Sequence, residues 1–521
     1  MGLARHVSLV GTVDFVSELP DLPYLPHPPD RRYPSSHALK PLAALLTLLV
    51  LAAGHPVAQQ PAAALVRLQH DIDALLAAPA FERGAVAIVV RSLATDETIY
   101  TLNAPRLMMP ASTLKIVTLA AAAERLGWDH AYETRIVADG PVDGGTLEGN
   151  LVIVGSGDPS LDRPAIDSWA EQIKMLGVTK VTGRVLADAR AFSGEGIGFG
   201  WSWDDLAYYY AAPIAAVQFR ENAVDITVRP GPSPDAPVSY ELMSPEITGL
   251  RIENRMTTGA RTAALEFVAR RAANSSTVVL EGVLPVGSPP VVRALSVHDP
   301  VRYLAAAFTE ALLAAGVALG GPPPLDASAD AARDYSRATP MVTHRSAPLR
   351  VLARRLMEVS QNQYAETFIK TIGAHAGAPT FEGGLKVIES VLASWGIAAD
   401  GAILRDGSGL SRYDYVTAEL LVQVMTRMYR DPAQRAPFLS TLNVAGQSGT
   451  LATRMKNTPA VGNVRAKDGS MAGVRALSGL VNTADDEPLA FAILVNNFAA
   501  PGPTVTAAID AIVVRLAGFR R

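Results

Sequence analysis

Ser112 and Lys115 stand three residues apart at the start of an apolar segment that is predicted to form a helix ending at Gly127. On a helix this spacing places the two side chains on one face, one turn apart. A desolvated, neutral lysine can take the proton of the serine hydroxyl and so create a nucleophile. The helix N-terminus adds free N–H groups that suit a developing oxyanion. Serine is also an ordinary residue at helix starts, so the pair alone does not separate catalysis from capping.

Two later stretches hold polar side chains that suit the same chemistry. Ser360 and Asn362 follow one predicted helix and precede another, which is expected from about Tyr364. Because residues two apart do not share a helix face, both side chains can act together only from a turn between the helices. The third stretch is Lys467-Asp468-Gly469-Ser470, at a predicted strand. Each residue alone has a plain structural explanation: a helix cap for Ser360, a turn for Asn362, a solvated strand lysine for Lys467. Their ordered combination favours a site.

Composition excludes several other kinds of site. The 521 residues carry a formal net charge of −4, so no basic field indicates nucleic-acid binding. The chain has no cysteine, which removes thiolate nucleophiles and cysteine-bound metals. Its nine histidines show no metal-ligand spacing. We therefore expect neither a metal nor an organic cofactor.

The first 58 residues are expected to be a disordered N-terminus followed by a signal peptide. Residues 1 to about 35 are rich in proline and lack periodicity. Basic residues up to Lys40 then precede a short apolar run over 41–53, with cleavage expected near Ala58. A membrane anchor or a buried helix is the alternative for this run. We expect a periplasmic or otherwise extracytoplasmic protein, with membrane contact at most peripheral or through an uncleaved N-terminal segment.

The rest of the chain is predicted to be α+β, in three consecutive parts. Residues 59–131 and 343–521 are expected to form the main domain, and 132–342 to form one or more inserted β-rich subdomains. Strand candidates at both ends of the chain predict one antiparallel sheet, covered by the terminal helices on one face. The Ser112 helix and the Ser360 turn would belong to a helical cluster on the other face.

These three segments, in this order, resemble the motifs of the active-site-serine penicillin-recognising enzymes. Ser112-x-x-Lys115 is similar to S-x-x-K, Ser360-x-Asn362 to S-x-N, and Lys467-Asp468-Gly469 to K-T-G. The long gap between the first two motifs is similar to that of the class C low-molecular-mass penicillin-binding proteins. These are D-alanyl-D-alanine carboxypeptidases with inserted domains. The resemblance covers roughly residues 60 to 520. It implies a transpeptidase domain of the serine β-lactamase and DD-peptidase type, which acts on peptidoglycan stem peptides and is acylated by β-lactams such as penicillins.

The resemblance also implies catalytic roles, and the residue chemistry fits them. Ser112 would attack the carbonyl carbon of a D-Ala-D-Ala bond. Lys115 would be the base, with its pKa lowered by burial and by the nearby cation Lys467. Ser360 would relay a proton to the leaving amine.

Substrate binding is expected to involve Asn362 and the strand residues Lys467, Asp468, Gly469 and Ser470. The amide of Asn362 offers both a donor and an acceptor for the peptide chain of the substrate. The backbone N–H groups of Ser112 and Ser470 would form an oxyanion hole, which contributes about 3–4 kcal/mol per donor in comparable sites.

The third motif departs from the family pattern, because Asp468 stands where the family has threonine. In the family, that threonine hydroxyl helps to bind the terminal carboxylate of the substrate. A like charge about 4 Å away costs roughly 1–4 kcal/mol. Three outcomes are open: Asp468 is protonated or turned away, the preferred substrate lacks a free carboxylate there, or the enzyme is impaired. We expect weak carboxypeptidase turnover that Asp468→Thr raises.

Three alternatives stay open at this point. The protein can be a catalytically weak penicillin-binding scaffold of the cell envelope. It can be a β-lactamase or esterase of the same superfamily, although the long insertion argues against this. A DD-endopeptidase that cuts cross-links would use the same residues as the carboxypeptidase, and both activities can coexist.

Overall fold

The computed structural model describes residues 59–521. The expected disordered N-terminus and signal peptide over 1–58 lie outside the described residues. The first described helix is α1 (Gln59–Leu76). Among the helices of residues 59–521, none has the length and apolar character needed to cross a membrane.

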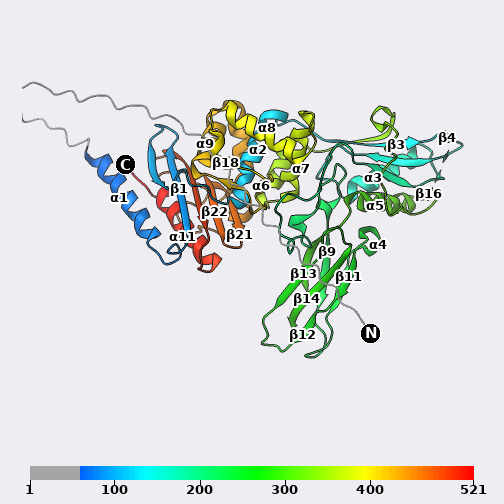
Figure 1. Cartoon of the computed structure of the whole chain (residues 1–521), viewed down its shortest axis with the longest axis horizontal. Helices are drawn as coiled ribbons and strands as arrows, with labels where there is room; N and C mark the ends of the chain where they lie inside the picture. Colours follow the sequence, from blue (N-terminus) through cyan, green and yellow to red (C-terminus); the bar gives the residue numbers. More distant parts are fainter. Residues whose placement is uncertain (1–58) are drawn as a thin grey trace, which may run out of the picture. The chain divides into compact units, whose positions relative to one another are not determined.

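The main sheet has six antiparallel strands, and it is built from both ends of the chain (Figure 1). Its spatial order is β2-β1-β23-β22-β21-β20. The bounds are β1 (Ala85–Ser92), β2 (Thr98–Leu102), β20 (Asn443–Val444), β21 (Arg465–Met471), β22 (Val474–Asn482) and β23 (Pro488–Asn496). Strands β1 and β23 pair along their whole length, from Ala85 opposite Asn496 to Ser92 opposite Leu489. The predicted sheet is confirmed.

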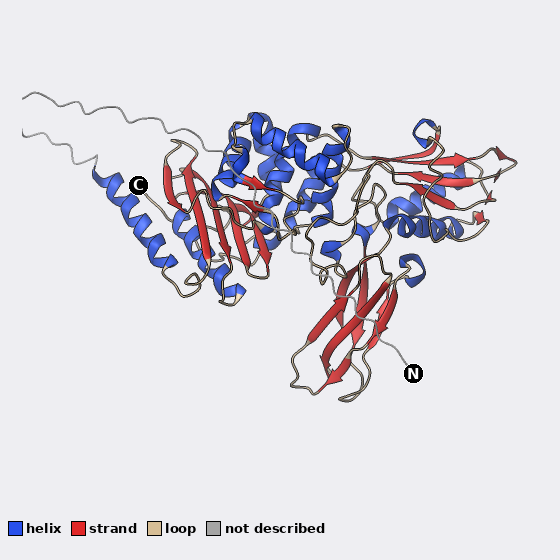
Figure 2. Cartoon of the chain, in the orientation of Figure 1, coloured by secondary structure: helices blue, strands red, loops and turns tan. Residues whose placement is uncertain are grey.

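Apolar side chains cover both faces of this sheet, because successive side chains of its strands point to opposite faces. On β23, Ala490, Ala492 and Leu494 pack into one core, and Phe491 and Ile493 pack into the other. Successive side chains of a strand point to opposite faces, so a strand that is apolar throughout must be covered on both sides. Helices α1 and α11 (Gly502–Ala517) cover one face (Figures 1 and 2).

The other face is covered by a helical cluster that contains the two serine motifs. Helix α9 contacts both β1 and β23, and α2 packs against α7, α8 and α9. The bounds are α2 (Lys115–Leu126), α6 (Leu349–Glu358), α7 (Asn362–His375), α8 (Phe381–Ser394), α9 (Ala418–Arg430) and α10 (Pro432–Thr441). A short hairpin, β18 (Ala402–Ile403) with β19 (Tyr415–Val416), lies between α8 and α9 in the sequence.

The chain between α2 and α6 forms several smaller sheets and three helices around a separate apolar core (Figure 2). One sheet has the order β17-β3-β6-β8, and its strands are β3 (Glu133–Asp139), β6 (Asn150–Val154), β8 (Val185–Asp188) and β17 (Pro340–Arg345). Another small sheet contains β4 (Val142–Asp143), β5 (Thr146–Leu147), β7 (Lys180–Val181) and β16 (Ala318–Leu319). The helices are α3 (Arg163–Met175), α4 (Pro245–Thr248) and α5 (Pro300–Ala314).

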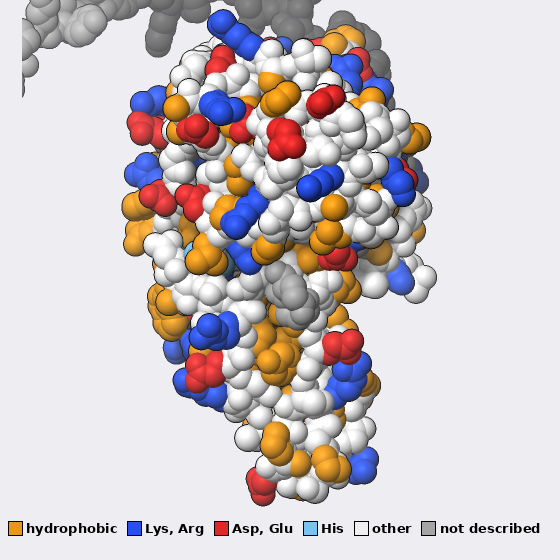
Figure 3. Space-filling view, turned by 90° about the vertical axis from the view of Figure 1, so that its right-hand side faces the viewer, with side chains coloured by type: hydrophobic (Ala, Val, Ile, Leu, Met, Phe, Trp, Pro, Cys, Tyr) orange, Lys and Arg blue, Asp and Glu red, His pale blue; other side chains and the backbone are white. Residues whose placement is uncertain are grey.

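The remaining strands of this stretch form two further sheets. The first contains β9 (Ala223–Arg229), β10 (Ser239–Leu242) and β15 (Val291–Ser296). The second contains β11 (Arg251–Asn254), β12 (Thr257–Gly259), β13 (Glu266–Arg270) and β14 (Thr277–Pro285). The α+β class with added β-rich elements is confirmed, whereas the exact domain limits at 131/132 and 342/343 stay predictions. On the face shown in Figure 3, basic and acidic side chains are interspersed.

Helix α1 allows a direct test of the packing on the outer face of the sheet. Leu68 is 1% exposed in that core, whereas Val66 on the same helix is 62% exposed. We expect Leu68→Ala to lower the free energy of unfolding by about 2–5 kcal/mol, because the truncation leaves a cavity. The matched variant Val66→Ala should change it by less than about 0.5 kcal/mol. Urea unfolding followed by circular dichroism measures both, and equal losses would contradict this packing.

Candidate active site

Ser112 lies in a tight 3₁₀ turn, η1 (Ala111–Leu114), that leads directly into α2. The sequence predicted that Ser112 begins the same α-helix as Lys115, but the α-helix begins only at Lys115. The turn starts with a strained backbone, because Ala111 has a φ of 46°. The predicted proximity is nevertheless present: the Nζ atom of Lys115 lies 2.8 Å from the Oγ atom of Ser112.

Lys115 is completely buried, and its amine lies among three oxygen atoms. Besides Ser112, Nζ contacts the Oδ1 atom of Asn362 at 2.7 Å and the carbonyl oxygen of Ser408 at 2.9 Å. Burial, followed by the positive charge of Lys467, lowers the pKa of Lys115 to about 7. A neutral amine has two hydrogens and one lone pair. It can donate to Asn362 and Ser408 while the lone pair accepts from the Ser112 hydroxyl, which is the arrangement of a general base.

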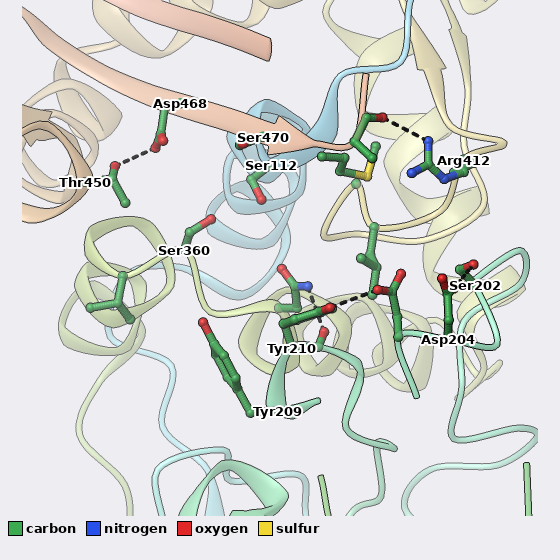
Figure 4. A pocket seen from close by; sticks show the side chains of 17 residues that line it. Ser112, Ser202, Asp204, Tyr209, Tyr210, Ser360, Arg412, Thr450, Asp468 and Ser470 are labelled. Atoms are coloured by element: carbon green, nitrogen blue, oxygen red, sulfur yellow. Dashed lines mark hydrogen bonds between the residues drawn. The ribbon is translucent and has the colours of Figure 1, made fainter. Parts of the chain in front are cut away.

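Ser360 and Asn362 occupy the turn between α6 and α7, where the sequence predicted them. Ser360 has a φ of 60°, and its side chain points toward Ser112 across the cleft (Figure 4). Asn362 is the first residue of α7, so this helix begins two residues earlier than predicted and Gln361, not Ser360, caps it. The Nδ2 atom of Asn362 donates to the carbonyl oxygen of Tyr210 at 2.8 Å. Both ends of the amide therefore have protein partners, and a role in holding the substrate stays a prediction.

On β21, Lys467 is buried and interacts with the residue that follows it. Its Nζ atom donates to the backbone oxygen of Asp468 at 2.7 Å and to Oδ1 of the same residue at 2.9 Å. Thr450 also donates to Oδ1, and Arg454 lies 3.9 Å from Oδ2. Burial raises the pKa of Asp468. Other effects outweigh burial and hold this pKa well below its usual range: the charge of Lys467, the hydrogen bonds from Thr450 and Lys467, and the charge of Arg454. Asp468 is therefore an ionised carboxylate.

Gly469 allows β21 to approach the Ser112 turn closely. A Cβ atom at this position would lie 2.6 Å from the carbonyl oxygen of Pro110 and 3.1 Å from the nitrogen of Ser112. Any larger residue would push the strand away from the turn. Glycine thus places Ser470 and Ser112 on the same wall of the cleft (Figure 4).

A cleft of about 590 Å³ is lined by Ser112, Ser360, Asn362, Asp468 and Ser470, among others. In Figure 4, Thr450 and Asp468 lie on one side of Ser112, Asp204 and Arg412 lie on the other, and Tyr209 and Tyr210 lie below it. Since Asp468 faces the cleft, it is not turned away from the site. The lining residues are Ser112, Ser202, Asp204, Asp205, Tyr209, Tyr210, Val359, Ser360, Asn362, Gly409, Leu410, Arg412, Thr450, Asp468, Ser470, Met471 and Ala472.

A buried loop beneath Lys115 holds the acceptor Ser408 in place. Asp406 accepts hydrogen bonds from the N–H groups of Gly409 and Ser411, both at 2.7 Å, and from the indole of Trp201 at 2.8 Å. This segment is therefore a buried turn under the site, and Trp201 packs against it. Trp203, two residues further on, is 67% exposed.

Sequence reasoning missed Glu366, Thr450 and Tyr210 as parts of the site. Glu366 is fully buried on α7 and accepts from the N–H groups of Gly407 and Ser408, both at 2.9 Å. Its position four residues after Asn362 puts both on one helix face, which is a signal that the sequence offered. The contact of Tyr210 involves only its backbone oxygen, so no side-chain pattern could have indicated it.

The fold is shared with a solved penicillin-binding protein. Penicillin-binding protein 4 (DacB) from Haemophilus influenzae matches with a TM-score of 0.76 at 24% sequence identity, over 86% of this chain and 100% of that one. The same protein in complex with a β-lactam matches with a TM-score of 0.70 over 85% of this chain and 97% of that one, also at 24% identity. The chain therefore has the fold of penicillin-binding protein 4, and the Ser112 cleft lies beside its main sheet.

Sequence comparison identifies the family. The chain belongs to the D-Ala-D-Ala carboxypeptidase 3 (S13) family, whose model matches residues 68–517. A D-alanyl-D-alanine carboxypeptidase of Actinomadura sp. is 36% identical over 91% of this chain and 89% of its own length. The carboxypeptidase DacB of Haemophilus influenzae is 26% identical over 80% of this chain and 86% of its own. The family resemblance is confirmed, and a catalytically weak scaffold is not favoured.

The environment of Lys115 predicts a specific pH dependence. A base must be unprotonated, so acylation should proceed above about pH 7 and fall about tenfold per pH unit below it. Lys467→Met removes the adjacent positive charge and leaves Asp468 unneutralised, and both effects raise the pKa of Lys115. The rate of penicillin acylation is therefore to be measured as a function of pH. The low-pH part of this curve, its acid limb, should move to higher pH in the variant.

The control for this experiment is Lys456→Met, which removes an exposed lysine outside the cleft. It should leave the acid limb in place. An unchanged limb, or a shift to lower pH, in the Lys467 variant would contradict the electrostatic role of Lys467.

Proposed function

We propose that this protein is a serine-type D-Ala-D-Ala carboxypeptidase that cleaves peptidoglycan stem peptides through an acyl-enzyme on Ser112. The observation that carries the proposal is the 2.8 Å contact between Ser112 Oγ and the buried amine of Lys115, whose pKa lies at about 7. Two relatives are named D-alanyl-D-alanine carboxypeptidases, which supports the same substrate class.

In the acylation step, the Oγ atom of Ser112 attacks the carbonyl carbon of the scissile bond, and its proton passes to Lys115. The N–H groups of Ser112 and Ser470 stabilise the oxyanion. The C–N bond then breaks, and Ser360 relays the proton from Lys115 to the leaving amine. The products of this step are D-alanine and a peptide ester of Ser112.

In the deacylation step, a water molecule attacks the ester while Lys115 takes a proton from it. The ester bond breaks, the shortened peptide leaves with a new carboxylate, and the Ser112 hydroxyl is restored. The residues of this step act without a metal or an organic cofactor. Because a β-lactam amide presents the same carbonyl carbon to Ser112, penicillins should form a corresponding acyl-enzyme.

We also propose that the protein works outside the cytoplasm, where peptidoglycan lies. The basic flank and short apolar run within residues 1–58 support export by a signal peptide. Contact with the membrane would be at most peripheral or through an uncleaved N-terminal segment.

Replacing the nucleophile tests the proposed function. With a peptide ending in D-Ala-D-Ala, the wild-type protein should release D-alanine, measured by mass spectrometry, and should be labelled by a fluorescent penicillin. Ser112→Ala should abolish labelling and reduce release by at least about 10³-fold, since the acyl bond cannot form. Ser233→Ala, at an exposed serine outside the cleft, should retain both activities. Labelling that persists in Ser112→Ala would refute the assignment of the nucleophile.

The balance between carboxypeptidase and endopeptidase activity needs a separate measurement. Besides Tyr209 and Tyr210, Asp204 and Arg412 line the cleft. We expect purified peptidoglycan digested with the protein to yield both D-alanine and separated cross-linked peptides, identified by mass spectrometry. Release of D-alanine with all cross-links intact would restrict the activity to carboxypeptidase.

A further inference from the structure

The two ends of the cleft differ in the charged side chains that line them. Thr450 and Asp468 lie on one side of Ser112, the Asp468 end, whereas Ser202, Asp204 and Arg412 lie on the other side (Figure 4). In the proposed reaction the acyl part of the substrate is the long stem peptide, whereas the released part is a single residue. We assign the long part to the end lined by Ser202, Asp204 and Arg412, so the released residue lies beside Asp468.

The two cations that contact Asp468 already have anionic partners. Lys467 donates both to the backbone and to the carboxylate of Asp468, at 2.7 and 2.9 Å. Arg454 pairs with Asp510 at 2.5 Å and lies farther, 3.9 Å, from Asp468. Among the described residues that line the cleft, Arg412 is the one cation, and it lies at the opposite end. No unpaired positive charge of the described cleft therefore faces a carboxylate on the released residue.

The hydroxyl of Thr450 is also fully used. It donates its hydrogen to Oδ1 of Asp468 and accepts from Nδ2 of Asn443 at 2.8 Å. A hydroxyl has a single hydrogen, so Thr450 has none left for a substrate. The hydroxyl of Ser470 can donate to an acid or to an amide alike, and the charged group that the Asp468 end presents is the ionised carboxylate of Asp468, which is an acceptor only. An N–H group can donate to it, whereas another carboxylate is repelled.

We propose that Asp468 directs this enzyme toward peptides whose released residue ends in a neutral carboxamide instead of a free carboxylate. The inference rests on the proposed function, with the same nucleophile and the same scissile bond. The carboxamide N–H donates to Asp468, and the Lys467 pair stays intact. In this account Asp468 does not impair the enzyme, because it changes which leaving residue the enzyme prefers.

The test compares one acyl peptide ending in D-Ala-D-Ala with the same peptide ending in D-Ala-D-alaninamide. For the wild-type protein, kcat/KM should be at least about tenfold higher for the amide, as expected for removal of one close like-charge contact. Asp468→Thr frees Lys467 and adds a hydroxyl donor. It should raise kcat/KM for the acid at least about tenfold and bring the amide-to-acid ratio below one. Asp468→Asn removes only the charge, and its ratio should lie near one.

Asp204→Asn is the matched control, because it removes one negative charge from the other end of the same cleft. Its amide-to-acid ratio should stay within about twofold of the wild-type ratio. A wild-type ratio of one or less, or a ratio that both Asp468 variants leave unchanged, would overturn the inference while the proposed function stands. If neither substrate is cleaved and penicillin forms no acyl-enzyme, the proposed function fails, and the inference fails with it.

Discussion

The structure of this site depends on the burial of one amine. The Nζ atom of Lys115 is removed from water and lies within 2.9 Å of Ser112, Asn362 and Ser408. A protonated amine is costly in such a place, so burial favours the neutral form that can act as a base. These three partners come from three distant parts of the chain. Any movement of one of them would alter both the pKa and the geometry of the base, and for this reason the surrounding packing has to be rigid.

Several features of the fold serve this packing. Glycine at position 469 lets β21 approach the Ser112 turn, and the buried carboxylates of Asp406 and Glu366 hold the loop that contains Ser408. The stretch between α2 and α6 contributes as well, since the Tyr210 carbonyl orients the amide of Asn362. The inserted elements are therefore in direct contact with the machinery of the main domain.

Asp468 shows how a local departure from a family motif can be compensated. An isolated carboxylate beside the nucleophile would repel anionic substrates and disturb Lys115. Here the charges of Lys467 and Arg454 and the hydrogen bonds from Lys467 and Thr450 keep it ionised. The same contacts occupy the donors that would otherwise be available to a substrate. Stability of the site and selectivity for the leaving residue thus follow from one group of hydrogen bonds and charges.

The amino-acid sequence by itself determined the family, the α+β class and the segments of the site, because motif spacing and strand alternation are local properties that one chain displays directly. It also indicated the turn between two helices at Ser360, since residues two apart cannot share a helix face. Only the tertiary structure decided the partners of Asn362, the inclusion of Glu366 and the backbone of Tyr210, and the ionisation of Asp468. These depend on burial and on distances between groups far apart in the chain. A pKa is set by the charges and solvent around a group in space, which sequence spacing does not contain.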